Sequence, residues 1–201
     1  SPNVMIIGCA DSRAEPADIF SAAPGQLFVV RNVANLVPPY EETDGLHGVS
    51  AALEFAVGSL KVGHIVVMGH GGCGGVNASL SAAEDRPVGQ FVGPWVQLLD
   101  SARDEVLRRG SDDPQTDLEL AGVGVSIDNL MTFPFVREAV ESGALELHGA
   151  WFAIAHGELH WRDNTTKLFI YTIDHRHVFF EIFRPITVKV FFIPYDIWAR
   201  V

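Results

Sequence analysis

The sequence predicts an α/β fold in which a mostly parallel central sheet is flanked by helices and followed by a strand-rich C-terminal extension. Two observations lead to this prediction. Within residues 1–166, short apolar runs alternate with segments whose apolar residues recur at helical spacing. After Lys167, β-branched and aromatic residues form runs with partial two-residue alternation, which is typical of strands. The chain has 201 residues, 48% of them hydrophobic, so it is long enough to bury a core without disulfides.

Four apolar runs are predicted to be strands of the central sheet. The first, at 4–7, is continuously apolar and ends at Gly8, as expected of a strand that is buried on both faces. The runs at 27–30 and 64–68 have the same character, and the second of them is again followed by glycine. A fourth strand is expected at 145–154.

The segments between these strands are predicted to be helices. A short helix is expected at 16–22, because proline stands near its start. Apolar residues recur every three or four positions across 46–60 and again across 95–106, which predicts two amphipathic helices. The segment 125–142 predicts one or two helices with a break near Pro134.

The last part of the chain is predicted to be a β-rich extension, 167–201, distinct from a main domain at 1–166. We expect it to pack on the edge of the sheet or on a partner chain. The alternative is an exposed tail that aggregates unless it is covered. A hairpin turn is predicted at 174–177, and short strands are predicted at 168–173, 178–183 and 186–193.

Charge and hydropathy exclude two classes of partner. The net charge of -11 and the pI of about 5.0 disfavour a nucleic-acid binder, whose surface must neutralise phosphates. No apolar run reaches the roughly 18 to 20 residues that span a bilayer, so no membrane partner is expected. No targeting signal is visible after Ser1, and a cytoplasmic location is expected.

Two cysteines and one histidine stand where strands of the predicted sheet end. Cys9 and His70 each follow a predicted strand by two residues, and Cys73 follows three residues after His70 in a glycine-rich loop. Ligands bind outside the carboxyl ends of parallel strands, so the fold is expected to place these side chains along one rim. Two thiolates and one imidazole are a common zinc set with a fourth position open. The alternatives are buried core residues, or a disulfide between the cysteines.

Asp11 and Arg13 lie close to the first of these residues. Asp11 is expected to coordinate the metal or to accept a hydrogen bond from water on it, while Arg13 holds the carboxylate in a bidentate pair. The simpler alternative is an ordinary ion pair in a loop. A nucleotide-binding domain is a further alternative, because glycines at 69, 71 and 74 match a dinucleotide fingerprint. The acidic residue that this fingerprint requires about 20 residues later, at a strand end, has no match.

Four motifs together resemble the β-class carbonic anhydrases. They are Cys-Ala-Asp-Ser-Arg at 9–13, Arg-Asn-Val-Ala-Asn at 31–35, Gly-His-Gly-Gly-Cys-Gly-Gly at 69–75 and Leu-His-Gly-Ala-Trp-Phe at 147–152. The resemblance runs from about Val4 to about Leu159. Family members usually begin with a helical arm that embraces a partner subunit, whereas this sequence starts at the first strand.

The resemblance implies a zinc enzyme, a carbonate dehydratase of the lyase class, that interconverts CO2 and bicarbonate. By position, Cys9, His70 and Cys73 are then the Zn2+ ligands, and Asp11 and Arg13 form a catalytic dyad. Zinc-bound hydroxide would attack CO2 while the dyad orients it. The alternatives are an inactive zinc-binding homologue that acts as a sensor or scaffold, and a hydrolase of carbonyl sulfide or carbon disulfide. We expect a homodimer or a higher homo-oligomer.

Overall fold

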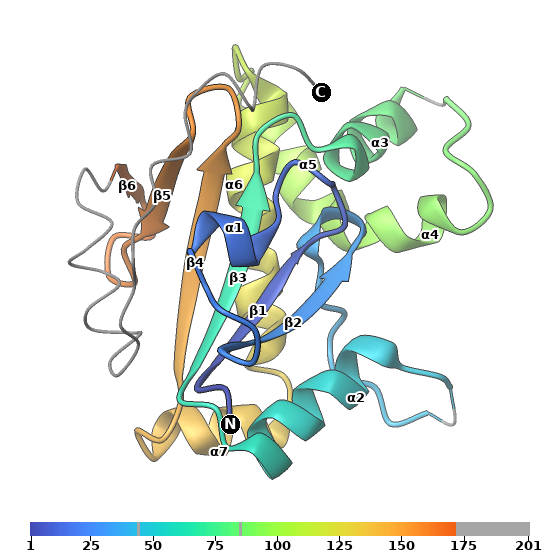
Figure 1. Ribbon diagram of the computed structural model, residues 1–201. Helices are drawn as coiled ribbons and strands as arrows, with labels where there is room; N and C mark the ends of the chain where they lie inside the picture. Colours follow the sequence, from blue (N-terminus) through green and yellow to red (C-terminus); the bar gives the residue numbers. More distant parts are fainter. Residues whose placement is uncertain (44, 85, 172–201) are drawn as a thin grey trace.

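The described part of the chain is organised around one six-stranded sheet. The computed structural model describes residues 1–43, 45–84 and 86–171. Within them the strands are β1 (Val4–Cys9), β2 (Leu27–Asn32), β3 (His64–His70), β4 (Glu146–Ala153), β5 (Glu158–Arg162) and β6 (Phe169–Tyr171). Their order across the sheet is β2-β1-β3-β4-β5-β6 (Figure 1). The first four of these neighbours run parallel, while β5 is antiparallel to both β4 and β6, so the predicted mostly parallel sheet is confirmed.

Helices lie on both sides of this sheet, with α1 in front of it and α6 behind it in the view of Figure 1. The α-helices are α1 (Pro16–Ile19), α2 (Gly48–Glu54), α3 (Gly74–Ala83), α4 (Val92–Val96), α5 (Asp100–Arg108), α6 (Pro114–Leu130) and α7 (Pro134–Glu141). The other helical segments are the 3-10 helices η1 (Val33–Asn35) and η3 (Gln97–Leu99) and the π-helix η2 (Phe55–Leu60).

The central strands are buried on both faces, which explains their continuous apolar sequences. Met5 and Ile7 of β1 belong to a buried cluster that includes Leu130 of α6. Ile6, which points to the opposite face, belongs to a second buried cluster with Phe20, the residue that follows α1. Because successive side chains of a strand alternate between faces, a strand covered on both sides needs apolar residues at every position.

The predicted helices differ in extent from those observed. The helix predicted at 16–22 ends earlier, because Ser21 adopts a left-handed backbone conformation with φ of 48°. The helix predicted at 46–60 begins at Gly48 and continues through the π-helix η2. The helix predicted at 95–106 is divided into α4, η3 and α5.

The longest helix of the described residues, α6, begins before the predicted start at 125. Asp113 caps α6 by accepting a hydrogen bond from the backbone N–H of Thr116 at 3.1 Å, and Pro114 occupies the first turn. The predicted break is confirmed, because α6 ends at Leu130 and α7 begins at Pro134.

The far edge of the sheet contains a strand that the sequence did not predict. β5 pairs with β4, and although its Leu159 and Trp161 alternate with polar residues, the run has only five residues and two apolar positions. β6 falls within the strand predicted at 168–173 and pairs with β5. The turn predicted at 174–177 and the strands predicted at 178–183 and 186–193 lie outside the described residues. Among the helices of the described part, none combines the length and apolarity of a membrane span.

Candidate metal centre and active site

The candidate centre lies where two neighbouring parallel strands end. Cys9 is the last residue of β1 and His70 is the last residue of β3, so both strands extend two residues beyond their predicted ends. β1 and β3 are hydrogen-bonded neighbours with Gly8 opposite Met68. Their carboxyl ends therefore meet at one edge of the sheet, as expected for a site in an open α/β fold.

A glycine-rich turn returns the chain from β3 to this edge and places Cys73 directly before α3. Gly72 has a φ of +66°, a conformation that L side chains rarely adopt. Gly75 leaves no room for a side chain, because a Cβ atom there would lie 2.6 Å from Cγ1 of Val33 and 2.9 Å from Cβ of Ala34. The glycines of this loop thus allow both the turn and the close packing of α3 against η1.

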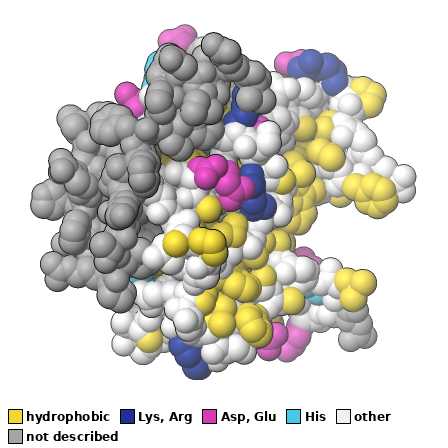
Figure 2. Space-filling view, in the orientation of Figure 1, with side chains coloured by type: hydrophobic (Ala, Val, Ile, Leu, Met, Phe, Trp, Pro, Cys, Tyr) yellow, Lys and Arg dark blue, Asp and Glu magenta, His cyan; other side chains and the backbone are white. Residues whose placement is uncertain are grey.

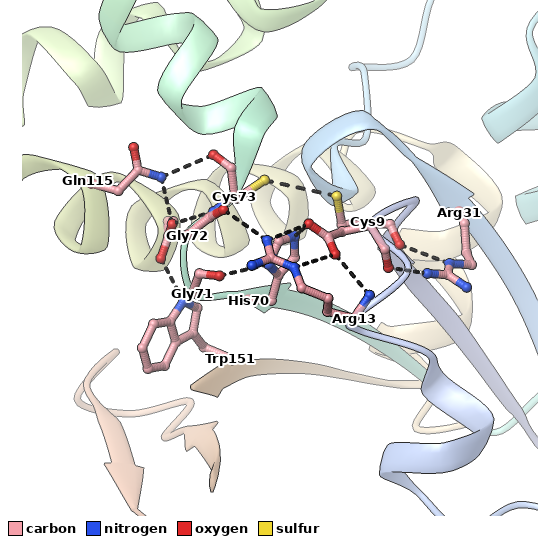
Figure 3. Close-up of polar contacts among 11 residues, drawn as sticks. Cys9, Arg13, Arg31, His70, Gly71, Gly72, Cys73, Gln115 and Trp151 are labelled. Carbon is pink, nitrogen blue, oxygen red and sulfur yellow. Dashed lines mark hydrogen bonds and ion pairs between the residues drawn. The ribbon is translucent and has the colours of Figure 1, made fainter. Parts of the chain in front are cut away.

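The structure brings the three predicted metal ligands together (Figure 3). The Sγ atoms of Cys9 and Cys73 are 3.9 Å apart, and the ligand atoms of these two residues and His70 all lie within 4.8 Å of one another. All three residues are buried. Nδ1 of His70 is 3.0 Å from the carbonyl oxygen of Gly71, so this nitrogen donates and the lone pair of Nε2 faces the sulfurs. Buried Nε2 has no hydrogen-bond partner among the described residues.

The two thiols are electrostatically coupled. Their hydrogen bond lowers the pKa of Cys9 to about 4, although burial opposes this change. The same hydrogen bond, together with burial, raises the pKa of Cys73. One proton is therefore shared between two sulfurs, and a divalent cation in its place would stabilise both thiolates and supply the missing partner of His70. The donor set of two sulfurs and one imidazole nitrogen fits zinc.

Asp11 and Arg13 form the predicted bidentate pair beside the ligands. Nε of Arg13 donates to Oδ1 of Asp11 at 3.0 Å, and Nη2 donates to Oδ2 at 2.8 Å. The hydrogen bond from the Arg13 side chain is the main cause that lowers the pKa of Asp11 to about 2. Oδ2 of Asp11 lies 4.0 Å from Nε2 of His70. An ionised carboxylate thus stands at the edge of the candidate centre, held there by a guanidinium group.

Arg31 positions the loop that carries these residues. Its side chain donates to the carbonyl oxygens of Cys9 at 2.8 Å and Asp11 at 2.5 Å, and it forms an ion pair with Glu15. The sequence pointed to Arg31 only as part of a family motif. Its contacts show that one arginine on β2 fixes the backbone between the end of β1 and Asp11.

A buried carboxyl group fixes the other ligand loop, and the sequence did not single it out. Oε1 of Glu119, on α6, accepts hydrogen bonds from the backbone N–H of Cys73 at 2.8 Å and from Nε2 of Gln115 at 2.6 Å. Its Oε2 atom accepts one from Nε1 of Trp151 at 3.2 Å. Gln115 also donates to the carbonyl oxygen of Cys73 at 3.0 Å. Both backbone polar groups of Cys73 are therefore tied to α6.

Replacing Glu119 with glutamine is expected to destabilise the protein by about 2 kcal/mol, because the new amide nitrogen would face a buried N–H donor. Urea unfolding followed by circular dichroism measures this change. The matched control is Asp117→Asn, since Asp117 lies on the same helix but is exposed and accepts from Ser111. Equal stability of the two variants would show that the hydrogen bonds of Glu119 contribute little.

Two buried thiols and an imidazole gathered at one edge of the sheet, with an ion-paired carboxylate beside them, define an α/β protein with a cluster that could hold a transition-metal ion. A sequence model described as carbonic anhydrase matches residues 4–159. The chain therefore belongs to the carbonic anhydrase family, and its relatives place it in the β class.

Three relatives illustrate this membership. Beta carbonic anhydrase 3 of Arabidopsis thaliana is 37% identical in an alignment 164 residues long that covers 78% of this chain and 63% of that protein. The chain thus spans somewhat less than two thirds of this curated relative. The structure of the β-carbonic anhydrase CcaA has a TM-score of 0.77 at 29% identity and covers 87% of this chain and 79% of its own. A tetrameric β-carbonic anhydrase of Sordaria macrospora has a TM-score of 0.71 at 34% identity, with 80% of each chain covered.

Proposed function

We propose that this protein is a zinc-dependent carbonic anhydrase that catalyses the reversible hydration of CO2 to bicarbonate and a proton. The observation that carries the proposal is the convergence of Cys9, His70 and Cys73 beside the Asp11–Arg13 pair. Membership of the carbonic anhydrase family supports the same activity. In this proposal the first three residues hold Zn2+, and the pair acts on the reacting water.

The chemistry divides between the metal and the protein. Zinc, when bound, lowers the pKa of a water so that hydroxide is available near neutral pH. Oδ2 of Asp11, 4.0 Å from Nε2 of His70, would accept a hydrogen bond from the reacting water and so orient it toward CO2. Arg13 keeps the carboxylate ionised and in place through its two side-chain hydrogen bonds.

A stopped-flow CO2 hydration assay on protein of measured zinc content tests the proposed function directly. We expect one zinc per chain and hydration well above the uncatalysed rate. Zinc binding without hydration would instead favour the inactive homologue that acts as a sensor or scaffold. Nucleotide binding without zinc would favour the dinucleotide-binding alternative at the loop 69–74.

Hydration is expected to become faster as the pH rises from about 6 to about 9. Two thiolates offset the charge of Zn2+, so the water is acidified less than in a site made of neutral ligands. Asp11, whose pKa is about 2, is already ionised across this range and does not contribute to the rise. The measurement is the pH dependence of the hydration rate, with zinc content checked at each pH. A flat profile would contradict the assignment of two thiolate ligands.

We propose further that the enzyme is a homodimer or a higher homo-oligomer. Hydrophobic side chains gather over part of the face shown in Figure 2, and Val29 on the edge strand β2 and Phe55 after α2 are 38% and 51% exposed. An exposed apolar edge of this kind favours association with a second copy. Sedimentation equilibrium tests this, with an expected mass of at least twice the 21.9 kDa of one chain.

A cytoplasmic location remains our proposal for the compartment. The candidate centre needs both of its cysteines reduced, and the cytoplasm keeps thiols in that state. Fractionation of cells that produce the protein would test this, with the soluble cytoplasmic fraction as the expected location.

A further inference from the structure

A second cluster of potential metal-ligating side chains lies at the opposite edge of the sheet, where β3 and β4 begin. His64 is the first residue of β3, and its partner across the strand pair is Glu146, the first residue of β4. His148 follows two residues after Glu146, so its side chain projects from the same face of the sheet. Figure 1 shows the beginnings of β3 and β4 side by side, far from the strand ends that carry Cys9 and His70.

The three side chains converge on one point. Nδ1 of His64 is 3.1 Å from Nε2 of His148, and that nitrogen is 3.8 Å from Oε2 of Glu146. One ligand atom from each residue lies within 4.8 Å of the other two. Two imidazole nitrogens bound to a tetrahedral zinc at about 2.05 Å stand about 3.3 Å apart. The observed separation of the two rings therefore needs only a few tenths of an ångström of adjustment.

The surroundings of the cluster also suit a cation. The side chain of His148 is 8% exposed. Its ring centroid lies 5.4 Å from that of Trp161, and this packing restricts the orientation of the imidazole. Burial lowers the pKa of both imidazoles, that of His148 to about 4, so both rings are neutral at physiological pH and have lone pairs available. The side chain of Glu146 is 67% exposed and leaves the cluster open to solvent on one side.

We propose that His64, Glu146 and His148 form a second metal site that binds a divalent first-row cation such as Zn2+, with water completing its coordination. Two imidazoles and one carboxylate are an established donor set for zinc. The hydrogen now shared between the rings moves to the other nitrogen of the ring that donates it, so binding requires no net loss of a proton. The bound ion would link the beginning of β3 to the beginning of β4. This site uses no residue of the candidate centre, so it stands or falls independently of the proposed activity.

Zinc titration by calorimetry, on protein already loaded at the candidate centre, tests the second site. We expect one further equivalent to bind to the unaltered protein. Glu146→Gln should weaken this event by at least about 10-fold, because disturbing even the partners of metal ligands costs that much affinity. The matched control is Glu158→Gln. It removes a carboxylate 3.6 Å from His160, elsewhere on the same sheet and outside the proposed site, and should leave the titration unchanged.

A second variant and a second readout decide between the metal site and a plain pair of hydrogen-bonded histidines. His64→Asn should likewise weaken binding of the further equivalent by at least about 10-fold, and Glu146→Gln decides alone if the His64 variant does not fold. Excess zinc should raise the melting temperature of the loaded protein, and this rise should disappear in Glu146→Gln but persist in Glu158→Gln. Loaded protein that binds no further zinc would overturn the proposal. A further equivalent whose affinity is unchanged in Glu146→Gln would also overturn it.

Discussion

The serine variant of Cys73 is expected to lose its tightly held zinc and, with it, CO2 hydration. Cys73 is 1% exposed and its sulfur lies 3.9 Å from that of Cys9, so its loss leaves one thiolate and one imidazole of the proposed ligand set. Serine preserves the approximate shape, but its hydroxyl is a poor ligand because it stays protonated at neutral pH. We expect less than one tenth of the zinc to remain after dialysis, and hydration to fall about 1000-fold or more, toward the uncatalysed rate.

The measurements for this variant are zinc per chain by atomic absorption and hydration by stopped flow. His156→Gln is a suitable control, because His156 is an exposed potential ligand in the turn between β4 and β5. It should keep both zinc and activity. If Cys73→Ser retained one zinc per chain and a normal rate, the proposed ligand set would be wrong.

Replacing Arg13 with alanine is expected to separate metal binding from catalysis. The variant loses both side-chain hydrogen bonds to Asp11, while all three proposed ligands remain. The released carboxylate, 4.0 Å from Nε2 of His70, can then turn onto the metal position and occupy the place of the reacting water. Zinc content should stay at one per chain, while hydration should fall about 100-fold or more, the usual contribution of a positioned acid–base group.

Two further variants sharpen this test. Arg13→Lys should recover part of the rate, because an ammonium group can pair with Asp11 but cannot reproduce the bidentate contact. Arg86→Ala removes an exposed arginine from a 2.7 Å ion pair with Glu84, away from the site, and should leave the rate unchanged. A fully active Arg13→Ala variant would remove the dyad from the mechanism.

The sequence predicted the central strands and the five residues of the candidate site because both leave local signals. Strands covered on two faces need continuous apolar runs, as at β1 and β3, and parallel neighbours end at one edge. Cys9 and His70 could therefore be placed together although they lie far apart in the chain. Only the exact strand ends differed.

The supporting residues leave no comparable signal. Glu119 is a single acidic residue within a helix, and nothing near it in the chain indicates that it will reach the backbone of Cys73. The early start of α6 was predictable in principle, because Asp113 and Pro114 are a typical cap and first turn. β5 alternates polar and apolar residues, but a run of five with two apolar positions is too short to predict a strand without its pairing to β4, which is a tertiary contact.

The closeness of the two sulfurs also decides how the protein should be handled. When no cation lies between them, Cys9 and Cys73 are close enough to form a disulfide. Oxygen from air oxidises one thiol to a sulfenic acid, which then condenses with the other thiol and releases water. Chelator treatment in air should therefore cause damage that added zinc alone does not reverse, whereas the same treatment under nitrogen should be reversible. A purification that keeps a phosphine reductant and trace zinc in every buffer follows from this arrangement.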